Sequence, residues 1–165
     1  MMKHLILALL SACFLFGGES MSGIAQPSQI EPGFHDFLEA VDKAQRELQN
    51  GKPAAFKALW SHSGTITLSG GFGGDIEKGW ANVSKRLDWV GTQFTNGTNT
   101  ITRLVTVAEG QLGYVIQSEH IEYLAPGQAE RSFKDYRVTM IFRKENGRWL
   151  IVHRQADSNL VKQSP

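Results

Sequence analysis

Two segments near the end of the chain constrain its fold more than any other feature, because together they have the pattern of a tight β-hairpin. Residues 131–144 and 148–157 are rich in β-branched and aromatic side chains, and they flank the dipeptide Asn146-Gly147. This dipeptide tolerates the positive φ angles of a type I′ turn better than most others do. The sequence therefore predicts a pair of antiparallel strands over these two segments.

Helices are predicted first along the chain, and strands after them. Apolar residues recur at helical spacing in the first half, whereas runs separated by Gly-containing turns dominate after Asn96-Gly97. The predicted helices cover 34–48, 53–60 and 78–94, and the predicted strands cover 64–69, 100–109, 112–124, 131–144 and 148–157. This order is typical of an α+β domain, in which helices pack on one face of an antiparallel sheet.

The beginning of the chain has the composition of an export signal. Lys3 precedes the apolar run Leu5–Phe16, and the small residues at Gly23 and Ala25 offer a cleavage site. The apolar run is shorter than the ~20 residues that a membrane span needs. We therefore expect a periplasmic or secreted protein without a membrane span. The expected segments are a signal peptide over 1–25, an extended lead-in over 26–33, a folded domain over 34–159 and a tail over 160–165.

The single cysteine, Cys13, leaves one alternative open. The residues from Leu10 to Cys13 resemble the lipobox of bacterial lipoproteins, in which a small residue precedes a lipidated cysteine. The apolar run continues as far as Phe16, whereas a lipobox usually closes such a run, so simple secretion is favoured over a lipid anchor. In either case the folded domain has no cysteine and is predicted to depend on its core instead of disulfides.

Charge and histidine spacing argue against several partners. The chain has 17 Lys and Arg against 16 Asp and Glu, a formal net charge of +1, and no basic block. Binding to nucleic acid or to an anionic membrane normally requires a basic patch, so neither partner is predicted. The histidines are scattered without a close i, i+4 pair. The sequence therefore predicts no metal site.

The hairpin sequence and the helix entry at Gly79–Val83 are similar to the nuclear-transport-factor-2-like superfamily, and within it to the SnoaL-like, ketosteroid-isomerase-like branch. The resemblance rests on the Arg-Val-Thr strand after Tyr136, the Asn-Gly turn, Trp149 and the Val-His-Arg triplet that begins at Val152. It implies a cone, in which a strongly bent antiparallel sheet wraps around three N-terminal helices and leaves an apolar cavity. It also implies a homodimer paired through the sheet.

The strand predicted over 148–157 supplies most of the candidate site. Side chains at every second position of a strand share one face. That face would carry Trp149, Ile151, His153, Gln155 and Asp157. Trp149, Ile151 and the Gln155 amide would line a pocket. His153 and Asp157 are the predicted catalytic residues, and they lie ~13 Å apart along an ideal strand. The alternative for His153 is a buried structural histidine, and the alternative for Asp157 is a solvated strand end.

An imidazole suits acid–base work because its ordinary pKa is near neutrality, and a carboxylate in an apolar cavity is a candidate base. Relatives in this branch tend to carry His-Arg-His before the final Ala-Asp, whereas this chain has Gln155 in place of the second histidine.

Other elements offer further pocket residues. Tyr136 and Met140 share one face of the strand over 131–144, and the Tyr136 hydroxyl is a polar group in that wall. Trp60 and Trp80 lie on or near helical faces and are predicted to line the core or border the mouth of the cavity. Packing in the core is the alternative for each of them.

The strand over 112–124 carries more charge than a buried wall usually does. Glu119 lies on one of its faces and Glu122 on the other. A solvated face or a subunit interface is favoured for these carboxylates over a role as a pocket acid.

The sequence thus predicts an exported domain that binds a small apolar or aromatic molecule. The resemblance implies a cofactor-free isomerase, cyclase or dehydratase that uses acid–base catalysis. A non-catalytic carrier or sensor, and a dimerisation or assembly module, are the alternatives. Fold alone does not decide among them, because one fold supports many functions.

Overall fold

The computed structural model describes residues 31–158. The predicted signal peptide, Cys13, most of the lead-in and the tail lie outside these described residues. The elements within them are α1 (Phe34–Leu48), α2 (Ala54–Ala58), β1 (Thr67–Ser69), β2 (Glu77–Lys78), α3 (Trp80–Gly91), β3 (Thr95–Glu109), β4 (Leu112–Leu124), β5 (Arg131–Glu145) and β6 (Arg148–Ser158).

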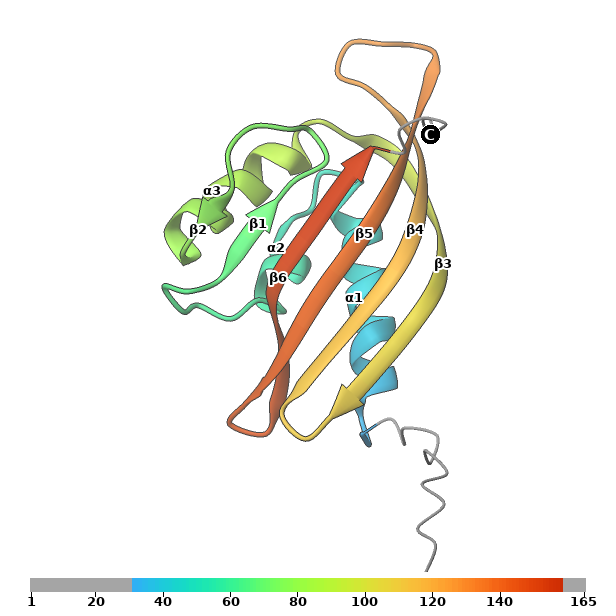
Figure 1. The fold of residues 1–165 in the computed structure, drawn as a ribbon. Helices are drawn as coiled ribbons and strands as arrows, with labels where there is room; N and C mark the ends of the chain where they lie inside the picture. Colours follow the sequence, from blue (N-terminus) through green and yellow to red (C-terminus); the bar gives the residue numbers. More distant parts are fainter. Residues whose placement is uncertain (1–30, 159–165) are drawn as a thin grey trace, which may run out of the picture.

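The strands form one mixed sheet in the order β2-β1-β6-β5-β4-β3. The four long strands, β3 to β6, are antiparallel neighbours, whereas β1 pairs parallel to β6 and carries β2 at the edge. Figure 1 shows the long strands arching past α1 and α2, with α3 beside β1 and β2. The predicted α+β cone, a bent sheet wrapped around three helices, is therefore confirmed. The parallel strand β1 is a feature that the sequence pattern did not predict.

The hairpin that links β5 and β6 forms as predicted. Asn146 has a φ of 51° and Gly147 a φ of 78°, the two successive positive angles that a type I′ turn requires. The paired residues on either side of the turn are Glu145 and Arg148.

The first helix buries one stripe of apolar side chains against the sheet. Phe34 is fully buried and packs edge-on against Phe142 of β5 and Trp149 of β6, with ring centroids 5.4 and 4.8 Å apart. The same stripe continues one and two turns later through Leu38 and Val41. Burial of such a stripe stabilises an amphipathic helix on a sheet.

A β-bulge in β6 decides which of its residues face the helices. Phe142 pairs with Ile151, and the preceding residue, Ile141, pairs with His153, so Val152 has no counterpart in β5. At the same point β6 exchanges backbone hydrogen bonds with the chain after α2, because Ile151 N–H donates to the carbonyl of Leu59 at 2.8 Å. An extra residue in one strand reverses the alternation of side chains beyond it.

The bulge contradicts the prediction that alternate residues of this strand share a single face. Trp149 and Ile151 are buried before the bulge, but Arg154 and Ala156 are buried after it. The residues whose predicted placement on the inner face is wrong are His153, Gln155 and Asp157.

Candidate functional site

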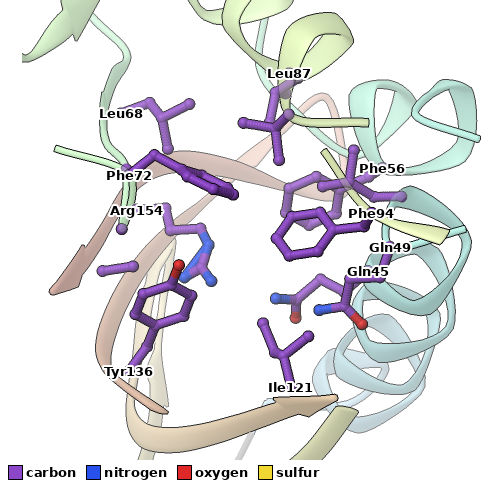
Figure 2. A pocket seen from close by; sticks show the side chains of 15 residues that line it. Gln45, Gln49, Phe56, Leu68, Phe72, Leu87, Phe94, Ile121, Tyr136 and Arg154 are labelled. Carbon is purple, nitrogen blue, oxygen red and sulfur yellow. The ribbon is translucent and has the colours of Figure 1, made fainter. Parts of the chain in front are cut away.

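A cavity of about 60 Å³ lies between the inner face of the sheet and the helices. Apolar side chains from several elements form most of its wall, among them Phe56 of α2, Leu68 of β1, Leu87 of α3 and Ile121 of β4 (Figure 2). Because each comes from a different element, the cavity exists only in the assembled fold.

Four polar side chains interrupt this apolar lining. Tyr136 of β5 and Arg154 of β6 enter from the sheet, whereas Gln45 of α1 and Gln49, the residue that follows α1, enter from the opposite side. Figure 2 shows the hydroxyl of Tyr136 and the guanidinium of Arg154 close together, facing the two amides. Hydrogen-bonding groups therefore converge on one region of an otherwise apolar space.

A buried ion pair holds Arg154 in place. Its Nη2 donates to Oε2 of Glu119 at 2.8 Å, and the side chains of these residues are 11% and 0% exposed. The other carboxylate oxygen, Oε1, accepts from Nε2 of Gln45 at 3.1 Å and from Nε2 of Gln117 at 2.7 Å. A buried charge is tolerated when it is paired and hydrogen-bonded in this way.

Several buried polar atoms at the cavity have no partner among the described residues. They are the hydroxyl of Tyr136, Nη1 of Arg154, and the Oε1 atoms of Gln45 and Gln49. Buried donors and acceptors in folded proteins are almost always hydrogen-bonded to protein, to water or to a ligand. These atoms therefore mark a place where a polar ligand group, or ordered water in its absence, completes the structure.

The Tyr136 hydroxyl is a neutral hydrogen-bonding group. Burial raises the pKa of Tyr136 to about 12, an effect that the positive charge of Arg154 partly opposes. At neutral pH the phenol therefore keeps its proton and can donate it in a hydrogen bond.

A glycine-rich loop forms the wall of the cavity beside Tyr136. Gly71 lies so close that a Cβ atom there would be 2.8 Å from Cδ1 of the tyrosine ring. The next residue, Phe72, packs against Trp89 and Phe94 with ring centroids 5.3 and 5.4 Å apart. The loop over 70–74 thus closes part of the cavity and does more than connect two strands.

Of the pocket residues predicted from the sequence, only Tyr136 lines this cavity. Four others belong to the packed core away from it: Trp60, Met140, Trp149 and Ile151. Trp80 is half-buried and stacks on His62 with centroids 4.0 Å apart, outside the cavity. Gln155 is exposed on the opposite face of the sheet.

The two predicted catalytic residues also lie outside the cavity. His153 is half-buried, and its Nδ1 lies 2.7 Å from Oγ1 of Thr67. Burial lowers the pKa of its imidazole, and a hydrogen bond with the backbone of Thr67 partly opposes this effect. Asp157 accepts two hydrogen bonds from Arg137, each 3.0 Å long. A catalytic role for either residue stays a prediction, and neither contacts the groups that converge in the cavity.

Sequence reasoning missed Arg154, Gln45 and Gln49, and it favoured solvent for Glu119, which is in fact 1% exposed. A signal for the glutamine was visible, because Gln45 falls on the buried stripe of α1 four residues after Val41. The inward position of Arg154 was not predictable from alternation, because the bulge shifts the alternation by one residue.

Residues 31–158 contain neither a cluster of metal ligands nor a membrane-spanning helix. No group of three His, Cys, Asp or Glu side chains there could hold a metal ion. No helix in that part of the chain is long and apolar enough to cross a membrane.

Comparison with known proteins places the chain in a family. The sequence model of the SnoaL-like domain matches residues 37–157, so the chain belongs to the SnoaL-like family. A comparison with curated proteins found no match.

Solved structures similar to this chain have the fold of the nuclear-transport-factor-2-like superfamily. A protein from Streptomyces avermitilis described as a dehydratase of that family is 15% identical, with a TM-score of 0.66 over 78% of this chain and 95% of its own. A protein from Novosphingobium aromaticivorans described as a scytalone dehydratase is 13% identical, with a TM-score of 0.61 over 76% and 89%. A protein from Thiobacillus denitrificans described as a calcium/calmodulin-dependent protein kinase type II association domain is 13% identical, with a TM-score of 0.63 over 82% of this chain and 100% of its own. At these identities the likeness establishes the fold and leaves function open.

Proposed function

We propose that the protein binds a small, mainly apolar molecule in the cavity bordered by Tyr136 and Arg154. The observation that carries this proposal is the set of buried polar atoms that lack a partner in an otherwise apolar wall. An apolar pocket with a few convergent polar groups is the usual form of a small-molecule site. The apolar wall would supply most of the affinity, and the polar atoms would orient an oxygen-bearing end of the ligand.

The size of the cavity limits what fits without movement. Its volume of about 60 Å³ is well below the ~300–1,000 Å³ of sites for drug-sized ligands. The loop over 70–74 is the part of the wall best able to move, because all of its residues except Phe72 are glycines and Phe72 is only half-buried. A larger ligand would enter by displacing Phe72.

Binding is better supported than acid–base catalysis. The lining of the cavity contains no His, Asp or Glu among the described residues. Glu119, which lies behind it, already accepts three hydrogen bonds. Proton abstraction needs a base that can reach the substrate, and no such group lines the cavity. A non-catalytic carrier or sensor therefore fits the site best.

One observation favours a second candidate, an enzyme. The neutral Tyr136 hydroxyl and the free Nη1 of Arg154 are donors placed together, which is the arrangement that stabilises developing charge on a substrate oxygen. The dehydratase descriptions of two similar structures agree with this candidate. Turnover would then depend on polarisation of a carbonyl or hydroxyl group by these two residues.

We further propose that the protein is exported through residues 1–25 and forms a homodimer through the outer face of the sheet. Tyr114 and Ile141 are register partners on that face, and together with Ile116 they are between 38% and 40% exposed. Apolar residues grouped on an exposed sheet are typical of an interface. Intact mass would locate the cleavage site and any lipid on Cys13, and sedimentation would give the oligomeric state.

Native mass spectrometry of the gently purified exported protein tests the binding function. The proposal predicts a discrete small-molecule adduct that is retained by an Asp157→Asn variant and weakened by Tyr136→Phe. Both substitutions are nearly isosteric, but only Tyr136 lines the cavity. An adduct that depends on Asp157 and ignores Tyr136 would contradict the proposed site.

A further inference from the structure

The charge balance inside the cavity points to the class of ligand. We infer that the site selects an uncharged carbonyl or carboxamide compound over the corresponding carboxylate, and that Glu119 sets this preference. The inference rests on the proposed function, because it concerns the same cavity.

The positive charge of Arg154 is already balanced before a ligand arrives. Arg154 is the one charged residue among the described residues that line the cavity, and its guanidinium pairs with Glu119 at 2.8 Å. Glu119 is 1% exposed, so solvent does little to screen this pair. The pair therefore behaves as a neutral unit that still offers one free donor, Nη1 of Arg154.

A carboxylate ligand would upset that balance. Its charge would lie beside Arg154, but it would also lie near Glu119, and the three groups together would leave one uncompensated negative charge. Burial of an unpaired charge in an apolar site is strongly unfavourable. Lys134 does not remove the penalty, because it does not line the cavity and its ammonium lies over the ring of Phe72, 4.8 Å from the centroid.

An uncharged carboxamide matches the free atoms without that penalty. Its carbonyl oxygen can accept from Nη1 of Arg154 and from the Tyr136 hydroxyl, while its N–H groups can donate to a glutamine oxygen. The amide orientation of Gln45 is fixed, because its Nε2 must face the Glu119 carboxylate, and its Oε1 is thereby left free. Both the donors and the acceptors of the cavity wall thus have a partner on the carboxamide.

The test compares isosteric probes that differ in charge. Dissociation constants for benzamide and benzoate, and for the smaller pair acetamide and acetate, are measured by NMR titration at pH 7.5. The inference predicts that the wild-type protein binds each amide at least about tenfold more tightly than its acid, a difference of about 1.4 kcal/mol. Resonances of Tyr136 and Arg154 should shift during the titration.

Removal of the Glu119 charge should invert this preference. In a Glu119→Gln variant Arg154 has no anionic partner, so each acid should bind more tightly than its amide. Glu122→Gln is the matched control, because Glu122 lies on the same strand but is exposed on the other face. The control should keep the wild-type ratio.

The possible results distinguish failure of the binding function from failure of the charge selection. If neither amide nor acid binds the wild-type protein, the proposed binding function itself fails, and this inference fails with it. If the probes bind in the cavity but the acids bind as tightly as the amides, the binding function stands and charge selection is refuted. The wild-type ratio decides this point even if Glu119→Gln does not fold.

Discussion

Replacement of Arg154 by methionine should destabilise the protein far more than its single ion pair would suggest. Methionine is apolar and unbranched, so it replaces the aliphatic stem of the arginine but leaves Glu119 buried without a cation. Removal of one partner from a buried pair typically costs ~3–5 kcal/mol, because the remaining charge is uncompensated. The 11% and 0% exposure of these side chains places the pair in that class, and we expect a loss of about 3 kcal/mol.

Urea unfolding at pH 7, followed by tryptophan fluorescence, measures this loss. With a urea dependence of about 1.5 kcal/mol/M, a change of about 3 kcal/mol lowers the midpoint by about 2 M. Arg137→Met is the matched control, because Arg137 pairs with Asp157 by two 3.0 Å hydrogen bonds but their side chains are 56% and 46% exposed. Exposed pairs contribute ~0–1 kcal/mol, so the control should change the midpoint little.

A second substitution distinguishes an uncompensated charge from simple loss of packing. Glu119→Gln combined with Arg154→Met removes both charges and keeps an oxygen that accepts from Gln45 and Gln117. The double variant should therefore be more stable than Arg154→Met alone. A double variant less stable than the single one, or a single variant within about 0.5 kcal/mol of wild type, would refute the reasoning.

Three further predictions follow from particular contacts. Gly97→Ala should cost about 1–3 kcal/mol in the same unfolding assay, because a Cβ there would lie 2.7 Å from Cβ of Gln49, the buried residue that follows α1. Phe72→Ala should increase affinity for 2-naphthamide relative to benzamide in an NMR titration, since the loop then closes less of the cavity, and equal effects on both probes would contradict this. An NMR pH titration should place the pKa of His120 above 6.5, because of its hydrogen bond to Asp135, and the pKa of His153 below 6.5, because of burial. The stabilising contribution of His120 is then complete below about pH 6.5 and lost as the pH rises through its folded pKa, whereas that of His153 is present above about pH 6.5 and lost as the pH falls through its folded pKa. Asp135→Asn should weaken the first effect, because only Glu122 then raises the pKa of His120, and should leave the second unchanged.

Most of the fold follows from local patterns in the sequence. The stripe that begins at Phe34 predicts α1, and Asn146-Gly147 predicts the turn between β5 and β6, because both depend on contacts close in sequence. The alternation on β4 and β5 also predicts correctly that Tyr136 faces the helices. The parallel pairing of β1 with β6 depends on residues more than eighty positions apart, such as Thr67 and His153, and no local pattern specifies it.

The sequence pattern could not locate the site, because one inserted residue in β6 reverses which of the following side chains face the helices. Alternation from Trp149 assigns His153 to the inner face, but the bulge at Val152 places Arg154 there. That reversal also explains the wrong expectation for Glu119. A buried carboxylate is improbable without a cation, and uninterrupted alternation along β6 would place its cation, Arg154, on the outer face.

A co-crystal structure of the protein with benzamide tests the central claim most directly, because it shows where the ligand lies. We predict electron density inside the cavity, with the carbonyl oxygen within hydrogen-bond distance of the Tyr136 hydroxyl and Nη1 of Arg154, and with Phe72 displaced to admit the ring. Density on the outer face of the sheet near His153 and Gln155, with the cavity unchanged, would contradict the account.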